Sequence, residues 1–130
     1  MKIVVGYDPP HPDSKLLDRV IADAKMYNAH VYLVTSLFDG RKDDIEENDR
    51  KEEELLRVKA ILDKENIPSE THVLVCHDTA GEDIVSFAEV NGADEIIIQI
   101  KKTSRVGKLI SGSNAQYIIL NAPCSVVSVR

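Results

Sequence analysis

The sequence predicts an α/β fold with one open, doubly wound, five-stranded parallel sheet. Two observations carry this prediction. Short β-branched runs alternate strictly with segments of helical period, which is the pattern of βαβ units. The chain has 130 residues and is 43% hydrophobic, enough for one domain, residues 1–130, with a real core. Because parallel crossovers are right-handed, we expect the strand order 3-2-1-4-5.

The predicted strands are runs rich in Val, Ile and Tyr that carry no internal proline. The first is followed by a proline-rich stretch that neither a helix nor an inner strand would tolerate. The fourth contains four isoleucines and is apolar enough to be central in the sheet. The five expected strands are Lys2–Tyr7, His30–Leu37, Glu70–Cys76, Asp94–Ile100 and Cys124–Arg130.

The four predicted helices follow from capping residues and apolar spacing. Asp13 and Ser14 can cap the first, and the charged stretch Asp39–Glu54 predicts a loop leading into a long second helix that ends near Asn66. Two capping boxes open the others, and Asn91-Gly92 and Asn121-Ala122-Pro123 end them. The capping boxes are Thr79 with Glu82 and Ser113 with Gln116.

Composition excludes several classes of partner. The net charge is −6, so the surface repels phosphodiester backbones and anionic membranes, and we expect no nucleic acid and no membrane as partners. No apolar run reaches the roughly 20 residues that span a bilayer. The first residues do not resemble a signal peptide, and Cys76 and Cys124 are too few for a disulfide framework. A cytoplasmic location is expected.

The predicted topology places a ligand site where the winding of the sheet reverses, at the carboxyl ends of the first and fourth strands. Asp8 ends the first strand, and the loop Lys101–Ser113 follows the fourth. That loop holds four basic side chains and no acidic one, and it leads into a helix N-terminus, which favours an anion. Alternatively, the loop is an ordinary solvated connection, and Asp8 bonds its own loop amides.

Other chemistries have weaker signals. His72 and Cys76 lie four residues apart on one face of the expected strand, and His77 lies on the other face. The three side chains are therefore too far apart to bind one zinc ion. No serine-hydrolase elbow, zinc-protease pair or Walker loop is present, although Gly107-Lys108 superficially suggests a phosphate-binding lysine. A phosphorylated receiver domain needs more acidic groups than Asp8 supplies. The acidic stretch 39–54 is explained by a solvated helix face or by docking of a basic partner.

The whole chain resembles the universal stress protein family. The resemblance rests on Asp8 at the end of strand one, on Gly112-Ser113 before the last helix, and on the closing segment Asn121–Val127. It implies a flavodoxin-like sheet of the adenine-nucleotide alpha-hydrolase type. ATP-binding members carry Gly-x2-Gly-x9-Gly-Ser/Thr; here the last pair falls on Gly112 and Ser113, and the earlier glycines fall on Gln99 and Lys102. The sequence resembles a basic-loop variant lacking the first two glycines.

The resemblance also implies a set of nucleotide-binding residues. Asp8 would contact the adenosine half, with the backbones of Gly6 and Tyr7 beside it. Thr35 and Ser36 would border adenine, and Ile98 matches the apolar position before the motif. The phosphates would be surrounded by polar and basic loop residues and by the start of the last helix: Lys101, Lys102, Ser104, Arg105, Gly107, Lys108, Gly112, Ser113 and Asn114.

The expected function is that of a universal stress protein: a regulator or sensor in the stress response. It would bind ATP or AMP, with magnesium if ATP, or a similar phosphate-bearing molecule, and hydrolyse it very slowly at most. The family implies a homodimer joined through the last strand, where Ser125–Arg130 is β-branched and apolar. Two alternatives remain: a dimeric interaction module that does not bind nucleotide, favoured by Gln99 and Lys102, and a slow nucleotide hydrolase with a divalent ion beside Asp8.

Overall fold

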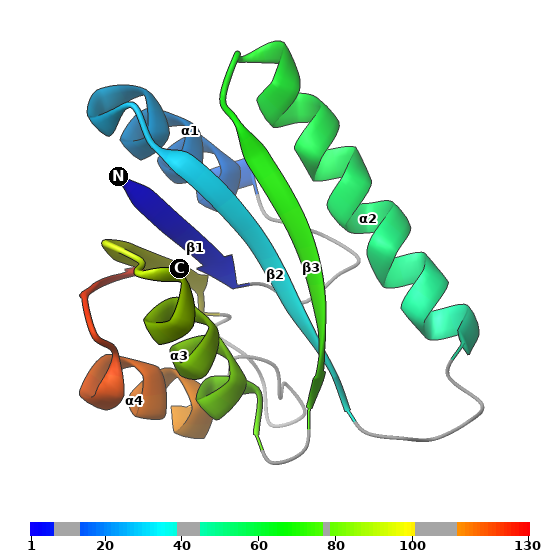
Figure 1. Ribbon diagram of the computed structural model, residues 1–130, viewed down its shortest axis with the longest axis vertical. Helices are drawn as coiled ribbons and strands as arrows, with labels where there is room; N and C mark the ends of the chain where they lie inside the picture. The colour runs from blue at the N-terminus through cyan, green and yellow to red at the C-terminus, as the bar shows by residue number, and fades with distance from the viewer. Residues whose placement is uncertain (7–13, 39–44, 77–78, 101–111) are drawn as a thin grey trace.

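The computed structural model describes residues 1–6, 14–38, 45–76, 79–100 and 112–130 (Figure 1). Five parallel strands form one sheet in the order β3-β2-β1-β4-β5, which confirms the predicted fold class and strand order. In chain order the elements are β1 (Lys2–Gly6), α1 (Ser14–Tyr27), β2 (His30–Phe38), α2 (Ile45–Lys64), β3 (Ser69–Cys76), α3 (Ala80–Asn91), β4 (Glu95–Gln99), α4 (Gly112–Asn121) and β5 (Ser125–Val129).

Two apolar cores, one on each face of the sheet, hold the helices in place. Helices α1 and α2 cover one face of the sheet, and α3 and α4 cover the other (Figure 1). Because side chains alternate along a strand, Ile97 joins the core under α1 and α2, whereas Ile96 and Ile98 join the core under α3 and α4. All five residues of β4 are buried between β1 and β5, so the predicted central position of the fourth strand is confirmed.

The ends of α3 agree with the capping prediction. The Thr79 hydroxyl accepts a hydrogen bond from the Glu82 amide over 3.2 Å, and Gly92 ends the helix in the left-handed conformation with φ of 66°. Local side-chain chemistry is sufficient at both ends, because a short oxygen acceptor satisfies a free N–H and glycine adopts positive φ without a Cβ clash.

Two other helix starts differ from the prediction. α4 begins at Gly112, so Ser113 lies inside the first turn, and its assignment as the N-cap is wrong. α2 begins at Ile45, so most of the charged stretch 39–54 is helical. Leu55, Val58 and Leu62 are buried along one side of α2 and hold the helix to the sheet, and the charged residues before them extend it towards its N-terminus.

No helix in the described ranges is long and apolar enough to cross a membrane.

The winding reverses between β1 and β4, as expected. β1 is followed by α1 on one face of the sheet, and β4 is followed by α4 on the other, while the two strands are paired from Ile3–Glu95 to Gly6–Ile98. The carboxyl ends of β1 and β4 therefore lie next to each other and are followed by chain segments that diverge to opposite faces. This is the position at which open α/β sheets bind ligands.

Candidate functional site

Gly6 and Ile98 form the floor of the switch point. They are register partners at the ends of β1 and β4, and both are buried. A Cβ on Gly6 would lie 2.8 Å from Ile84 Cδ1 of α3, which is closer than carbon atoms can approach. Glycine at this position therefore lets the second turn of α3 pack directly on the end of β1. Two residues of the predicted site are thus brought together.

The first turns of α3 and α4 lie side by side at the same end of the sheet. Asn114 Oδ1 accepts a hydrogen bond from the Gly81 amide over 3.0 Å, and a Cβ on Gly81 would lie 3.0 Å from the Asn114 carbonyl oxygen. Gly81 and Ala115 are buried in this contact, whereas Ser113 is exposed. The packing links the floor of the switch point, through α3, to the start of α4.

The two helix N-termini differ in charge. The first turn of α3 carries Glu82 and Asp83, whose carboxylates compensate the positive end of that helix dipole. The first turn of α4 carries no acidic residue. An anion near α4 would therefore meet N–H groups and a partial positive charge without a competing carboxylate.

Thr35 and Ser36 lie on β2 beyond the last described pair with β1, Gly6–Val34. Thr35 is 2% exposed and faces the α1 and α2 side, so its contribution to a site would come from its backbone. Ser36 faces the α3 side, and its buried Oγ has no hydrogen-bond partner in the described part of the chain. A buried hydroxyl of this kind can accept or donate a bond to a ligand.

Lys51 is a neighbour of the site that sequence reasoning missed. Its Nζ donates to the Ser36 carbonyl oxygen over 2.9 Å. Along β2, the His30 amide bonds to Met1 and the Val31 amide to Pro68, so even-numbered residues direct their backbone groups towards β1. The Lys51 ammonium therefore lies on the β1 side of β2, past Gly6. In the sequence, Lys51 only compensates part of the negative charge of neighbouring acidic residues, and no local pattern marks it as a site residue.

The comparisons with known proteins agree with this geometry. The sequence model of the universal stress protein family matches residues 1–130. The chain belongs to the universal stress protein family.

Solved structures extend the comparison. A universal stress protein from Archaeoglobus fulgidus is 34% identical with a TM-score of 0.85, and the match covers 100% of this chain and 98% of that one. The structure of the universal stress protein from Archaeoglobus fulgidus in complex with dAMP is 30% identical with a TM-score of 0.81 and the same coverage. An Arabidopsis thaliana family protein with AMP bound has a TM-score of 0.68 at 9% identity and covers 98% of this chain and 89% of that one, which shows the fold alone. No curated protein sequence matched.

Only part of the predicted nucleotide-binding set lies in the described ranges of this universal stress protein. Gln99, which the family resemblance aligns with the first motif glycine, is buried at 7% exposure and pairs with Val129 of β5. A side chain is thus accommodated there inside the sheet. The remaining predicted site residues lie outside the described residues: Tyr7, Asp8, Lys101, Lys102, Ser104, Arg105, Gly107 and Lys108.

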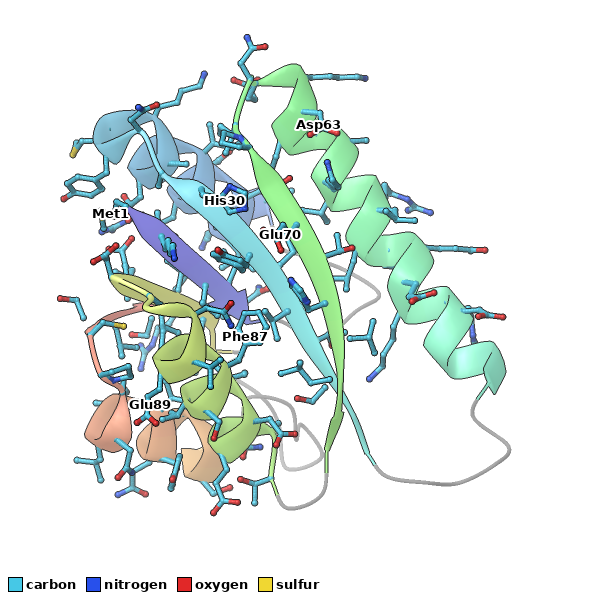
Figure 2. All side chains as sticks on the ribbon, viewed as in Figure 1. Met1, His30, Asp63, Glu70, Phe87 and Glu89 are labelled. Atoms are coloured by element: carbon cyan, nitrogen blue, oxygen red, sulfur yellow. The ribbon has the colours of Figure 1, made fainter. Side chains whose placement is uncertain are left out.

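A metal site is not found in the described ranges of this universal stress protein. His72 Nε2 instead lies 3.0 Å from Glu70 Oε1, and His30 Nε2 lies 2.9 Å from Glu70 Oε2, on the sheet face in front (Figure 2). The hydrogen bond from His72, followed by that from His30, lowers the pKa of Glu70. The other two residues considered as metal ligands, Cys76 and His77, have side chains that lie outside the described part of the structure. Cys124 packs at the edge of the core, and burial raises the pKa of its thiol, which disfavours a nucleophile.

Proposed function

We propose that this universal stress protein, a single domain over residues 1–130, binds an adenine nucleotide, ATP or AMP, or a similar phosphate-bearing small molecule at the β1/β4 switch point. The observation that carries the proposal is the α4 N-terminus, which has no acidic residue in its first turn and lies beside the first turn of α3. The dAMP complex of a relative at 30% identity supports a nucleotide as the ligand class. The protein would act as a sensor or regulator in the stress response.

The proposed roles divide the ligand between two ends of the site. Asp8 with Gly6 and Tyr7 would hold the adenosine half, with Thr35 and Ser36 at the base. The Ser36 hydroxyl, which has no hydrogen-bond partner among the described residues, supports a polar contact there. The basic residues after β4 and the amides of Gly112, Ser113 and Asn114 would hold phosphate, with magnesium if the ligand is ATP. Point charges on lysine and arginine would replace the glycine turns of the usual motif.

We also propose a cytoplasmic homodimer joined through β5. This strand lies at an edge of the described sheet. In a single protomer its valines are only half-buried, namely Val126, Val127 and Val129. A second copy would cover an otherwise open strand edge. Sedimentation equilibrium of the wild type and of Val127→Asp should give a dimer and a monomer, respectively. A wild-type monomer at micromolar concentration would reject the assembly.

The decisive test of nucleotide binding is isothermal titration with ATP, ADP and AMP, with and without Mg²⁺. Lys101→Ala/Lys102→Ala should weaken ATP more than AMP, because ATP carries more negative charge and therefore loses more attraction when two cationic side chains are removed. Lys64→Ala, an exposed lysine in the last turn of α2, is the matched control and should bind as the wild type does. Absence of heat with every nucleotide at millimolar concentration would reject the proposal.

A second candidate is an interaction module of the same fold that does not bind nucleotide. The buried Gln99 favours it, because a sheet-embedded side chain stands where the family motif has a flexible glycine. In that case the wild type should show no heat with nucleotide but should still dimerise. Binding gained by Lys102→Gly would identify the loop as a degenerate nucleotide site.

A further inference from the structure

A pair of buried carboxyl groups lies at the end of the sheet opposite the switch point. Glu95 begins β4 and is 7% exposed, and Asp23, one turn before the end of α1, is 6% exposed. Glu95 faces α1, as Ile97 does two residues later, and contacts Asp23 through the carboxyl groups. Asp23 Oδ2 and Glu95 Oε2 have no hydrogen-bond donor in the described chain.

The surrounding charges do not neutralise both groups. On α1, Arg19 Nε donates to the other oxygen of the aspartate, Oδ1, over 2.9 Å, and its side chain is half exposed. Asp94, the residue before β4, is exposed, and its carboxylate accepts a hydrogen bond from the backbone N–H of Lys2 in β1. Burial raises the pKa of the Cys124 thiol, which precedes β5, and the thiol is near enough to Asp94 and Glu95 for their negative charges to raise it further. The described environment is therefore richer in acids than in bases.

Two ionised carboxylates in contact repel each other, and neither carries a donor. We propose that Asp23 and Glu95 share one proton between Oδ2 and Oε2, and that this proton fastens α1 to β4 and makes the stability of the fold depend on pH. The shared proton satisfies both unpartnered oxygens with one hydrogen bond and removes one of two buried charges. The shared proton would join α1 to β4 at the end of the sheet opposite the candidate site.

The protonation energetics support the geometry. Burial, followed by the hydrogen bond with Asp23 and its charge, raises the pKa of Glu95 from 4.5 to about 7, and Arg19 opposes the rise. Because the folded pKa lies above the unfolded one, the stabilisation is complete below pH 4.5, declines as pH rises towards 7, and is lost above it.

The test is urea unfolding of the full chain between pH 5 and pH 8.5. Wild-type stability should fall with pH, and Glu95→Gln should flatten the profile and be the more stable protein at pH 8, because an amide donates a hydrogen bond without ionising. Glu89→Gln, on the exposed side of α3, is the matched control and should keep the wild-type slope. A wild-type slope in Glu95→Gln would overturn the proposal.

A second measurement has its main readout in the wild type, which does not depend on a variant folding. Carbon-13 NMR of the wild type should show the Glu95 carboxyl titrating near pH 7, as its raised pKa requires. A midpoint near the ordinary 4.5 would overturn the shared proton. Asp23→Asn should remove the anionic neighbour and lower that midpoint; an unchanged midpoint would also count against the pair. No nucleotide is present in these experiments, so their outcome is independent of the proposed function.

Discussion

The hydrogen bond from the Gly81 amide to the Asn114 side chain joins α3 to α4, and its removal should lower the stability of the fold. The Gly81 amide is one of the first four N–H groups of α3, which have no partner within the helix. Thr79 satisfies the Glu82 amide through its hydroxyl and the Asp83 amide through its carbonyl, and Asn114 Oδ1 satisfies Gly81. Because Gly81 is buried, Asn114→Ala removes the acceptor of a buried N–H group, which costs about 1–3 kcal/mol.

Thermal unfolding measures this loss. For a chain of this length each kcal/mol lowers Tm by about 4 °C, so Asn114→Ala should lose about 4–12 °C. Asn114→Asp keeps an acceptor oxygen and adds a negative charge at two helix N-termini, so it should retain most of the wild-type Tm. Gln116→Ala, an exposed position on the same helix, should change the free energy of unfolding by less than about 0.5 kcal/mol.

The reasoning is refuted if Asn114→Ala unfolds within 1 °C of Gln116→Ala. That result would mean that Gly81 finds another acceptor or water, and that the packing of α3 against α4 does not depend on the amide side chain. If the nucleotide proposal also holds, Asn114→Ala should weaken phosphate-bearing ligands, because the start of α4 loses its anchor beside the switch point.

Three further predictions concern stability and can be checked by urea unfolding. Gly92→Ala should cost about 1–2 kcal/mol because φ is 66°, whereas Gly92→Asn should cost less. Leu62→Ala should cost about 2–5 kcal/mol because the side chain is fully buried, and Leu56→Ala, 54% exposed on the same helix, should cost far less. Gly6→Ala should cost about 1–3 kcal/mol because its Cβ would meet Ile84 Cδ1 at 2.8 Å; a neutral result would show that the Ile84 side chain moves aside without cost.

Much of the fold was predictable because its signals are local. The Thr79 cap and the Gly92 end of α3 need only neighbouring backbone groups, and both were identified correctly. The isoleucine run marked β4 as central because only a strand covered on both faces tolerates such continuous apolar character. Ser113 was misplaced as the cap of α4 because the helix already begins at Gly112, a residue whose low helix propensity did not mark a helix start.

The candidate site was predictable in position but not in its supporting contacts. The strand order and the reversal of winding between β1 and β4 follow from alternation and handedness, and they selected the end of the sheet at which these two strands diverge. The Lys51 contact with Ser36 was not predictable, because Lys51 lies on a helix whose charge pattern is fully explained by solvation. Asn114 was considered for its backbone amide, and its side-chain role towards Gly81 depends on how two helices pack.

By itself, the sequence determined which segments become strands and helices, their order in the sheet, and the family to which the chain belongs. Hydrophobic period, capping residues and crossover handedness act over a few residues or through general topology, so they can be read without coordinates. Tertiary structure alone decided that Asp23 meets Glu95 and that Asn114 meets Gly81. These contacts join polar groups from separate elements, and their energy comes from burial that exists only once the helices are packed on the sheet.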